Sequence, residues 1–293
     1  MAFNYKTKPY EHQKEALLRS FARDNYAYFM EMGCGKSKVL IDNITWLYEN
    51  KKIDTAIIVA PKGVYMNWKN SEIPTHLPDN VDKNVYVWKA SANKTEKKIL
   101  EEGVKTRDKL RILLVNVESF ATAKVIKYLE AFIHRSNFML AVDESTTIKN
   151  IKAKRTKSVL KIGDSAQYKR ILTGSPITQS PMDLYAQCAF LDKDLLGFDS
   201  YWSFQGRYAI IRQTRMGNHS FQQVVGFRNL EELTDKLHRF AYRVTKEEAL
   251  DLPDKIYTTR EVVLTSDQIK HYNSMKDSAV AFLEGGDMVT APE

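Results

Sequence analysis

The stretch Met30-Glu31-Met32-Gly33-Cys34-Gly35-Lys36-Ser37 carries the strongest prediction of fold in this chain. It follows the apolar run Tyr26–Met30 and precedes a helical pattern, which gives the order strand, glycine-containing loop, helix. A triphosphate needs backbone N–H groups turned inward around it, which glycine permits, and a lysine that reaches its β and γ phosphates. The stretch therefore predicts a phosphate-binding loop.

Six consecutive residues of this loop are the candidates for nucleotide binding: Met32, Gly33, Cys34, Gly35, Lys36 and Ser37. The Ser37 hydroxyl stands at the start of the following helix, where we expect it to ligate a magnesium ion beside the phosphates. Met30 occupies the position of a glycine in the common pattern, five residues before Gly35, so the loop alone is a weak signal. Cys34 is expected to fill space, although Lys36 could lower the pKa of its thiol.

An acidic pair follows a second apolar run, Phe138–Val142. Asp143 is expected to hold magnesium, directly or through water, and Glu144 to polarise the attacking water. Together with Lys36 these two are the candidate catalytic residues. A carboxylate pair after a strand is an ordinary solvated turn when it stands alone, but here a phosphate loop precedes it.

Short apolar runs alternate with longer helical patterns along the chain. The expected strands are Tyr26–Met30, Ala56–Ala60, Val85–Trp88, Ile112–Val115, Phe138–Val142 and Arg170–Leu172. The clearest expected helices are Ser37–Tyr48, Ala121–Phe132 and Ala153–Ile162. Continuous apolar strands separated by helices predict an α/β fold of three layers, a parallel sheet with helices on both faces. Ligands bind beyond the carboxyl ends of such strands, so the loop and the acidic pair should meet there.

Composition limits the class of protein. The chain has 293 residues, 43% hydrophobic, with a net charge of +8, so it can form a core and suits a polyanionic partner without requiring one. Its two cysteines form no metal-ligand spacing or disulfide framework, which favours a reducing compartment. Met1–Tyr10 does not resemble a signal peptide, and the apolar runs are too short to span a bilayer. We expect a soluble intracellular protein of the cytoplasm, nucleoid or nucleus, with no membrane partner.

With these motifs in place, the chain resembles the first RecA-like lobe of the Swi/Snf family of ATPases, in helicase superfamily two. The resemblance extends from about Pro9 to Tyr272, and its elements occur in the family's order. They are Pro9-Tyr10-Glu11-His12-Gln13, Glu31–Ser37, Val59-Ala60-Pro61 with Asn67-Trp68, Val142-Asp143-Glu144-Ser145 with Ile148-Lys149-Asn150, Leu172-Thr173-Gly174-Ser175-Pro176-Ile177, Arg243-Val244-Thr245-Lys246 and Leu252-Pro253-Asp254-Lys255.

The resemblance implies roles for residues outside the loop and the acidic pair. Gln13 corresponds to the residue that recognises adenine, with an exposed helix position as the competing interpretation. The residues that would link nucleotide state to the grip on nucleic acid are Thr146, Thr173, Gly174 and Ser175. Thr146 stands where many relatives have histidine, which puts the strength of this coupling in question.

Nucleic-acid contacts are also implied by the resemblance. The candidate DNA-binding residues are Pro61, Lys62, Asn67, Asn116, Ser119, Lys149 and Asn150. Such side chains suit phosphate contacts, which position a protein without reading sequence. A solvated surface lysine is an equally good interpretation of Lys149, and Trp68 is expected to pack in the core rather than stack on a base.

Three regions are expected. Residues 1–194 would form a RecA-like ATP-binding lobe, and residues 195–242 a helical protrusion with a loop or hairpin turn at 212–220. Residues 243–293 would close the lobe and begin a linker to a second lobe, with a strand-like run at Glu261–Leu264. The aromatic residues Tyr201, Trp202 and Phe204 are expected in the core of the protrusion.

The resemblance implies a DNA-dependent ATPase that uses ATP and magnesium, moves along double-stranded DNA and needs an arginine from a second RecA-like lobe. No second phosphate-lobe pattern follows Tyr272, so we expect slow hydrolysis by this lobe alone. One alternative is a non-catalytic nucleic-acid-binding module that keeps a nucleotide pocket. Another is an RNA helicase lobe of the same superfamily, against which Arg243–Lys246 and Leu252–Lys255 argue.

Overall fold

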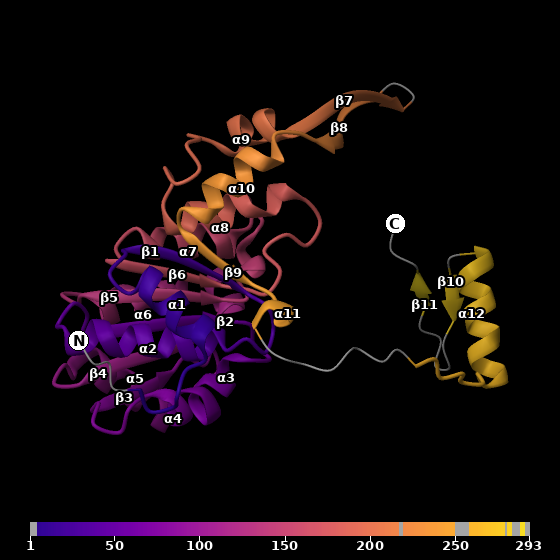
Figure 1. Ribbon diagram of the computed structural model, residues 1–293. Helices are drawn as coiled ribbons and strands as arrows, with labels where there is room; N and C mark the ends of the chain where they lie inside the picture. Colours follow the sequence, from indigo (N-terminus) through magenta and orange to yellow (C-terminus); the bar gives the residue numbers. More distant parts are fainter. Residues whose placement is uncertain (1–4, 217–218, 250–257, 279, 283–287, 291–293) are drawn as a thin grey trace. The chain divides into compact units, whose positions relative to one another are not determined.

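The computed structural model describes residues 5–216, 219–249, 258–278, 280–282 and 288–290 (Figure 1). The chain forms two compact units, Met1–Asp251 and Leu252–Glu293. The expected phosphate loop and acidic pair both belong to the first unit.

The first unit is built on a seven-stranded sheet with the order β3-β4-β2-β5-β6-β1-β9, in which every neighbouring pair is parallel. The strands are β1 (Asn25–Met30), β2 (Thr55–Ala60), β3 (Lys83–Val87), β4 (Leu110–Asn116), β5 (Phe138–Asp143), β6 (Tyr168–Leu172) and β9 (Ala241–Val244). Six of them are the strands expected from the sequence. Because only β6 lies between β1 and β5, the ends of those two strands are about 10 Å apart.

Alternate side chains of the strands enter two separate hydrophobic cores, one on each face of the sheet. Tyr28 of β1 belongs to the core beneath the first group of helices, and Phe29 to the core beneath the second. The first group is α1 (Glu11–Ser20), α2 (Lys36–Glu49), α3 (Tyr65–Asn67) and α4 (Ile73–His76). The second is α5 (Lys94–Lys105), α6 (Ala123–Ile133), α7 (Lys154–Gly163) and α8 (Leu184–Leu191). The three-layer α/β prediction is confirmed.

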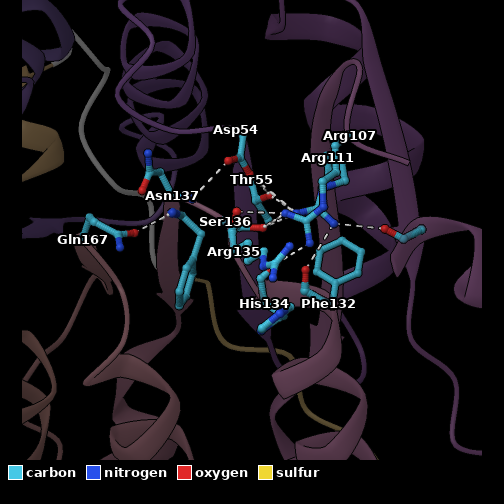
Figure 2. A network of polar contacts seen from close by, with 12 residues as sticks. Asp54, Thr55, Arg107, Arg111, Phe132, His134, Arg135, Ser136, Asn137 and Gln167 are labelled. Carbon is cyan, nitrogen blue, oxygen red and sulfur yellow. Dashed lines mark hydrogen bonds and ion pairs between the residues drawn. The ribbon is translucent and has the colours of Figure 1, made fainter. Parts of the chain in front are cut away.

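A polar network ties the strands together at their amino ends (Figure 2). Arg111 of β4 is fully buried, and its guanidinium donates to the carbonyl oxygens of Gly103 and Phe132. It also donates to the hydroxyls of Thr55, at 2.6 Å, and Ser136, at 2.5 Å. Both terminal nitrogens of the guanidinium thus have two acceptors each, which offsets part of the cost of its burial, whereas the buried Nε has no hydrogen-bond partner among the described residues. The network fixes the amino ends of β2 and β4. The candidate site lies at the opposite end of the strands, beyond their carboxyl ends.

The segment expected as a helical protrusion contains a β-hairpin. The hairpin turn expected within 212–220 is confirmed by the pairing of Met216 with His219, but the two long strands that flank it were not expected. Helix α9 (Tyr201–Tyr208) leads into β7 (Ala209–Met216), which pairs antiparallel with β8 (His219–Phe227), and α10 (Leu230–His238) follows. The hairpin projects from the rest of the first unit (Figure 1). The sequence did not indicate these two strands. Their apolar residues, such as Ile210 and Val225, are exposed, so the strands lack the continuous apolar runs that indicated the buried strands.

The aromatic residues of α9 do not all enter the core. Phe204 and Tyr208 are fully buried on one stripe of the helix, in the same core as the sheet. Trp202 points the other way with 61% of its surface exposed, so the prediction that it packs in the core was wrong. A lysine, Lys152, lies 5.2 Å from the centre of its ring.

The expected boundary between 242 and 243 falls inside β9, a strand of the main sheet. The short helix α11 (Lys246–Ala249) follows, and the second unit contains α12 (Ser266–Ser278), β10 (Val280–Phe282) and β11 (Met288–Thr290). The run Glu261–Leu264 is exposed and belongs to no strand, so the strand expected there was wrong. The matching segment Leu252–Lys255 lies outside the described residues. In the part of the chain that the structure describes, every helix is too short or too polar to cross a membrane.

Candidate functional site

The expected phosphate loop joins the end of β1 to the start of α2. Gly33 and Gly35 adopt left-handed backbone conformations, with φ of +90° and +81°, which other L-residues rarely take. Gly35 caps α2, whose first residues are Lys36 and Ser37. The N–H groups at the start of this helix have no partner within it, and the helix dipole makes this end positive. The loop therefore has the conformation of an anion-binding cradle.

Two side chains of α1 contact the backbone of the loop. Gln13 Nε2 donates to the carbonyl oxygen of Cys34 at 3.1 Å, and His12 Nε2 lies 2.9 Å from the same oxygen. Gln13 Oε1 accepts from the N–H of Tyr10 at 3.0 Å. A Cβ on Gly35 would stand only 2.2 Å from Gln13 Nε2. Gln13 thus supports the loop backbone, and its recognition of adenine stays a prediction.

The remaining loop side chains differ in exposure. Cys34 is fully buried, and burial raises the pKa of its thiol, which agrees with a space-filling role. Met32 is 71% exposed.

The metal-binding candidate Asp143 is the last residue of β5 and is 9% exposed. Its Oδ2 accepts from the indole Nε1 of Trp68 at 3.0 Å, and its Oδ1 from the N–H of Glu144 at 3.0 Å. Burial raises the pKa of Asp143 to about 6, opposed by the Trp68 hydrogen bond and the charge of Lys36. The charge of Lys36 therefore acts on Asp143, although the two residues are far apart in the sequence.

Glu144 adopts a left-handed conformation, φ +48° and ψ +60°, at the turn into a 3-10 helix, Ser145–Ile148. Such a conformation costs about 1–3 kcal/mol in a residue with a side chain, and strain of this kind clusters at functional sites. The Oγ1 of Thr173 donates to Glu144 Oε2 at 3.3 Å. The strained turn thus aims the carboxylate of Glu144 along the edge of the sheet toward β6.

The expected coupling residues after β6 contact both halves of the site. Thr173 bonds Glu144, and its Oγ1 also accepts from the N–H of Ser175 at 3.3 Å. A Cβ on Gly174 would lie 3.2 Å from the backbone nitrogen of Met32, so the turn packs directly on the phosphate loop. Thr146 is half-buried in the 3-10 helix, and its carbonyl accepts from Lys149 N. A larger residue at 174 would need the neighbouring backbone of Met32 to shift by a few tenths of an ångström.

The donor set fits a metal ion bound together with a nucleotide. Among the described residues there is no group of three or more His, Cys, Asp or Glu side chains placed to hold a metal. Ser37 and Asp143 would supply a hydroxyl and a carboxylate. Mg²⁺ prefers oxygen ligands and is usually held by one or two protein groups, water and substrate phosphates.

Five of the candidate DNA-binding residues lie at the ends of β2 and β4: Pro61, Lys62 and Asn67 follow β2, Asn116 ends β4, and Ser119 follows it. Lys62 and Asn67 are exposed, and Asn67 Nδ2 donates to Glu72 Oε1 at 3.2 Å. Pro61 is half-buried directly after β2. Asn116 and Ser119 are largely buried instead. Asn116 Oδ1 accepts hydrogen bonds from Ser119 N at 2.9 Å and from Ser119 Oγ at 2.7 Å. These two side chains shape the turn after β4.

Lys149 is engaged within the chain. Its Nζ donates to Thr178 Oγ1 at 2.5 Å and lies 3.4 Å from Asp183 Oδ2. Burial opposes ionisation of Asp183, but hydrogen bonds from the backbone N–H of Gln179 and from Thr178 hold its pKa below the usual value. Asn150 is exposed, and its Oδ1 accepts from Lys152 N at 2.9 Å. A DNA contact by Lys149 would have to compete with its ion pair.

Two residues near the site were not recognised as part of it from the sequence. Trp68 was correctly predicted to be buried, but its hydrogen bond to Asp143 was not foreseen. Lys246 donates its backbone N–H to Glu31 Oε2 at 2.9 Å, and its Cε would lie 3.2 Å from a Cβ on Gly33. The unexpected strand β9 explains the position of Lys246. It pairs parallel with β1, so the residues that follow it lie beside the phosphate loop that follows β1.

Comparisons with known proteins agree with this geometry. A family model described as "SNF2-related domain" matches residues 23–291. The chain is 28% identical over 263 residues to the SWI/SNF chromatin-remodeling complex subunit snf22 of Schizosaccharomyces pombe, covering 87% of this chain and 14% of that protein. It is 26% identical over 259 residues to the probable ATP-dependent DNA helicase CHR12 of Arabidopsis thaliana, covering 87% and 22%. The chain thus spans less than a quarter of the length of these relatives.

Among solved structures, the SWI2/SNF2 ATPase core of Sulfolobus solfataricus in complex with double-stranded DNA has a similar fold. The TM-score is 0.64 at 22% identity, and the match covers 94% of this chain and 55% of that one. The parallel sheet described above is accordingly a RecA-like fold. Since the family model extends over almost the whole sequence, including the phosphate loop and the acidic pair, this chain belongs to the SNF2-related domain family.

Proposed function

We propose that this chain is the ATP-binding lobe of a DNA-dependent ATPase, which hydrolyses ATP to ADP and phosphate when a second lobe is present. The observation that carries the proposal is that Lys36 follows the carboxyl end of β1 and that Asp143 and Glu144 lie at the carboxyl end of β5, with only β6 between the two strands. The effect of the Lys36 charge on Asp143 supports the same conclusion.

Each residue has a distinct part in the proposed reaction. Lys36 and the N–H groups of the loop neutralise the phosphates, and Ser37 and Asp143 hold Mg²⁺. The bound ion would offset negative charge on the β and γ phosphates. Glu144 orients a water molecule for in-line attack, and the hydrogen bond from Thr173 limits the positions that its carboxylate can take. Positioning and electrostatics supply most of the catalysis in such sites.

Double-stranded DNA is the proposed partner, and the complete protein would move along it without necessarily separating the strands. The net charge of +8 and the exposed Lys62 and Asn67 near the site support a polyanionic ligand. The names of the relatives give independent support, because one is described as a DNA helicase and the structural neighbour is a complex with DNA.

A second RecA-like lobe, in the same full-length chain, would complete the site with an arginine. Without that arginine we expect hydrolysis roughly a thousandfold slower or more. Binding of Mg·ATP needs only the residues of this lobe, so it should be measurable on this chain.

The replacement Lys36→Ala tests the proposal. Affinity for Mg·ATP should fall at least tenfold, because a charge-assisted contact to phosphate is lost, and DNA-dependent turnover of a two-lobed version should collapse. Lys52→Ala is the matched control, since Lys52 is an exposed lysine beyond the other end of α2. Retained turnover in the Lys36→Ala protein would refute the enzymatic proposal.

Two alternatives are separated by the same proteins. A non-catalytic nucleic-acid-binding module would bind DNA and nucleotide but show no DNA-dependent turnover in the two-lobed version. An RNA helicase lobe would be stimulated more by RNA than by duplex DNA when the two compete. Our proposal expects stimulation by duplex DNA and DNA affinity largely unchanged by Lys36→Ala.

A further inference from the structure

Trp68 connects two parts of the molecule that the proposed function treats separately. It follows directly after the segment 61–67, which contains the candidate DNA-binding residues Pro61, Lys62 and Asn67. It is 2% exposed, and its indole Nε1 lies 3.0 Å from Oδ2 of Asp143, 75 residues further along the chain. One side chain therefore joins this segment to the candidate metal ligand.

The chemistry of this contact is specific. An indole N–H only donates, so it pairs with an acceptor, and a carboxylate is the strongest acceptor that a protein offers. The other carboxylate oxygen of Asp143 accepts from Glu144 N. With one hydrogen bond to each oxygen, rotation of the carboxylate is restricted, and each oxygen keeps a lone pair for a metal or a water molecule.

The backbone around Trp68 is also unusual. Residues Trp68–Glu72 form a π-helical segment between α3 and α4. Such segments insert one extra residue per turn and occur frequently at functional sites. The ring of Trp68 is anchored in the hydrophobic core that includes Tyr65 and Ile73, one from each neighbouring helix. A displacement of the segment 61–67 would therefore be transmitted to the indole, rather than absorbed by a flexible side chain.

We propose that Trp68 is a positioning residue that sets the orientation of Asp143 toward a nucleotide-bound metal and couples this carboxylate to the segment 61–67. This inference rests on the proposed function for the identity of the ligand. It predicts that loss of the indole N–H weakens binding of the metal–nucleotide complex without weakening binding of the nucleotide alone.

Trp68→Phe removes the N–H and keeps an aromatic ring. The matched control is Trp88→Phe, since Trp88 is 4% exposed in the core on the other face and its Nε1 has no hydrogen-bond partner among the described residues. Binding of Mn·ADP is measured by electron paramagnetic resonance of the free ion, and binding of ADP in EDTA by calorimetry. We expect about tenfold weaker Mn·ADP binding for Trp68→Phe, an unchanged affinity for ADP in EDTA, and neither change for Trp88→Phe.

A second readout leaves Trp68 in place. In a variant with Trp46→Phe, Trp88→Phe and Trp202→Phe, the emission of Trp68 is the only tryptophan signal, because the chain has four tryptophans. Mn·ADP should change this emission more than ADP in EDTA does. Addition of duplex DNA should change it again, because contact with the segment 61–67 displaces the indole, and an emission that ignores DNA would refute the coupling. This measurement also serves where Trp68→Phe fails to fold.

The outcomes separate the two proposals. If the wild-type chain fails to bind Mn·ADP, the proposed function fails and this inference fails with it. If the wild-type chain binds and Trp68→Phe binds equally well, or the Trp68 emission ignores the metal, only the role of Trp68 is refuted. Equal weakening of ADP with and without metal would also refute it, since that result indicates general damage to the loop.

Discussion

At the scale of single residues, the phosphate loop depends on an interlock between α1 and a glycine. Gly35 has φ of +81°, and Gln13 fills the space that a side chain there would need. Two independent constraints, backbone conformation and close packing, thus demand glycine at one position. The sequence predicted the first constraint from the motif, but the second became visible only when Gln13 was placed.

The two constraints can be separated by mutation. Gly35→Ala should lower affinity for Mg·ATP by tenfold or more and destabilise the fold, because it adds a clash with Gln13 to about 1–2 kcal/mol of backbone strain. Gly35→Ala combined with Gln13→Ala should recover the part due to the clash. Urea unfolding and nucleotide titration of both variants and of Gln13→Ala check this. Losses in the double variant equal to the sum of the losses in the two single variants would contradict the interlock.

The carboxyl of Asp143 gives the site a pH dependence. Because burial raises its pKa to about 6, protons compete with a metal for the carboxylate. Affinity for the metal–nucleotide complex should therefore fall as the pH drops below about 6, approaching tenfold per unit. The effect on stability has the opposite sign, since a raised pKa favours the folded state at low pH, and this contribution is lost as the pH rises through about 6.

The titration is carried out from pH 7.5 to 5, and affinities are corrected for the metal affinity of free nucleotide in the same buffers. In Asp143→Asn, the corrected affinity for the metal–nucleotide complex should not fall as the pH drops. An equal fall in Asp143→Asn and wild type would assign the pH dependence to another group.

At the scale of elements, α2 contains a buried ion pair in addition to the loop that begins it. Lys38 Nζ lies 2.7 Å from Asp42 Oδ2, one helical turn apart, with side chains only 5% and 3% exposed. Burial raises the pKa of Asp42 to about 6 despite the hydrogen bond from Lys38. The cost of removing two charges from water is thus only partly recovered by their pairing.

This pair predicts a non-additive mutation series. Asp42→Leu leaves an uncompensated buried ammonium and should cost about 3–5 kcal/mol, whereas Lys38→Met should cost less, because Asp42 can take up a proton. The combination of both should be closer to wild type than Asp42→Leu is. Urea unfolding of the four proteins measures the coupling, and additive losses would show that the two charges do not interact.

The elements that the sequence predicted are those buried on both faces. Helices cover both faces of the sheet, so every residue of β2 and β5 is buried. These strands are therefore nearly continuous apolar runs, which can be recognised in the sequence. The hairpin β7–β8 has no such cover, and β9 is only four residues long with Arg243 exposed. Trp202 was misjudged because its spacing from Phe204 places the two on different sides of α9.

At the scale of the whole molecule, the site is a product of topology. Lys36 and Asp143 lie at the same end of the sheet because Lys36 follows β1, Asp143 ends β5, and only β6 separates these two parallel strands. Local patterns supplied each motif, and the rule for parallel sheets predicted which edge they share. What sequence reasoning could not supply was the support around them, in particular the indole of Trp68 and the approach of Lys246 to Gly33, since both depend on packing between distant segments.

The proposed function requires a metal–nucleotide complex to bind at the carboxyl ends of β1 and β5. A crystal structure of the chain with Mg²⁺ and a non-hydrolysable ATP analogue tests it most directly. We predict a phosphate oxygen about 3 Å from Lys36 Nζ, with the ion ligated by Ser37 Oγ and linked to Asp143 directly or through one water. An analogue bound elsewhere, or bound here with Lys36 and Asp143 turned away from it, would contradict the account.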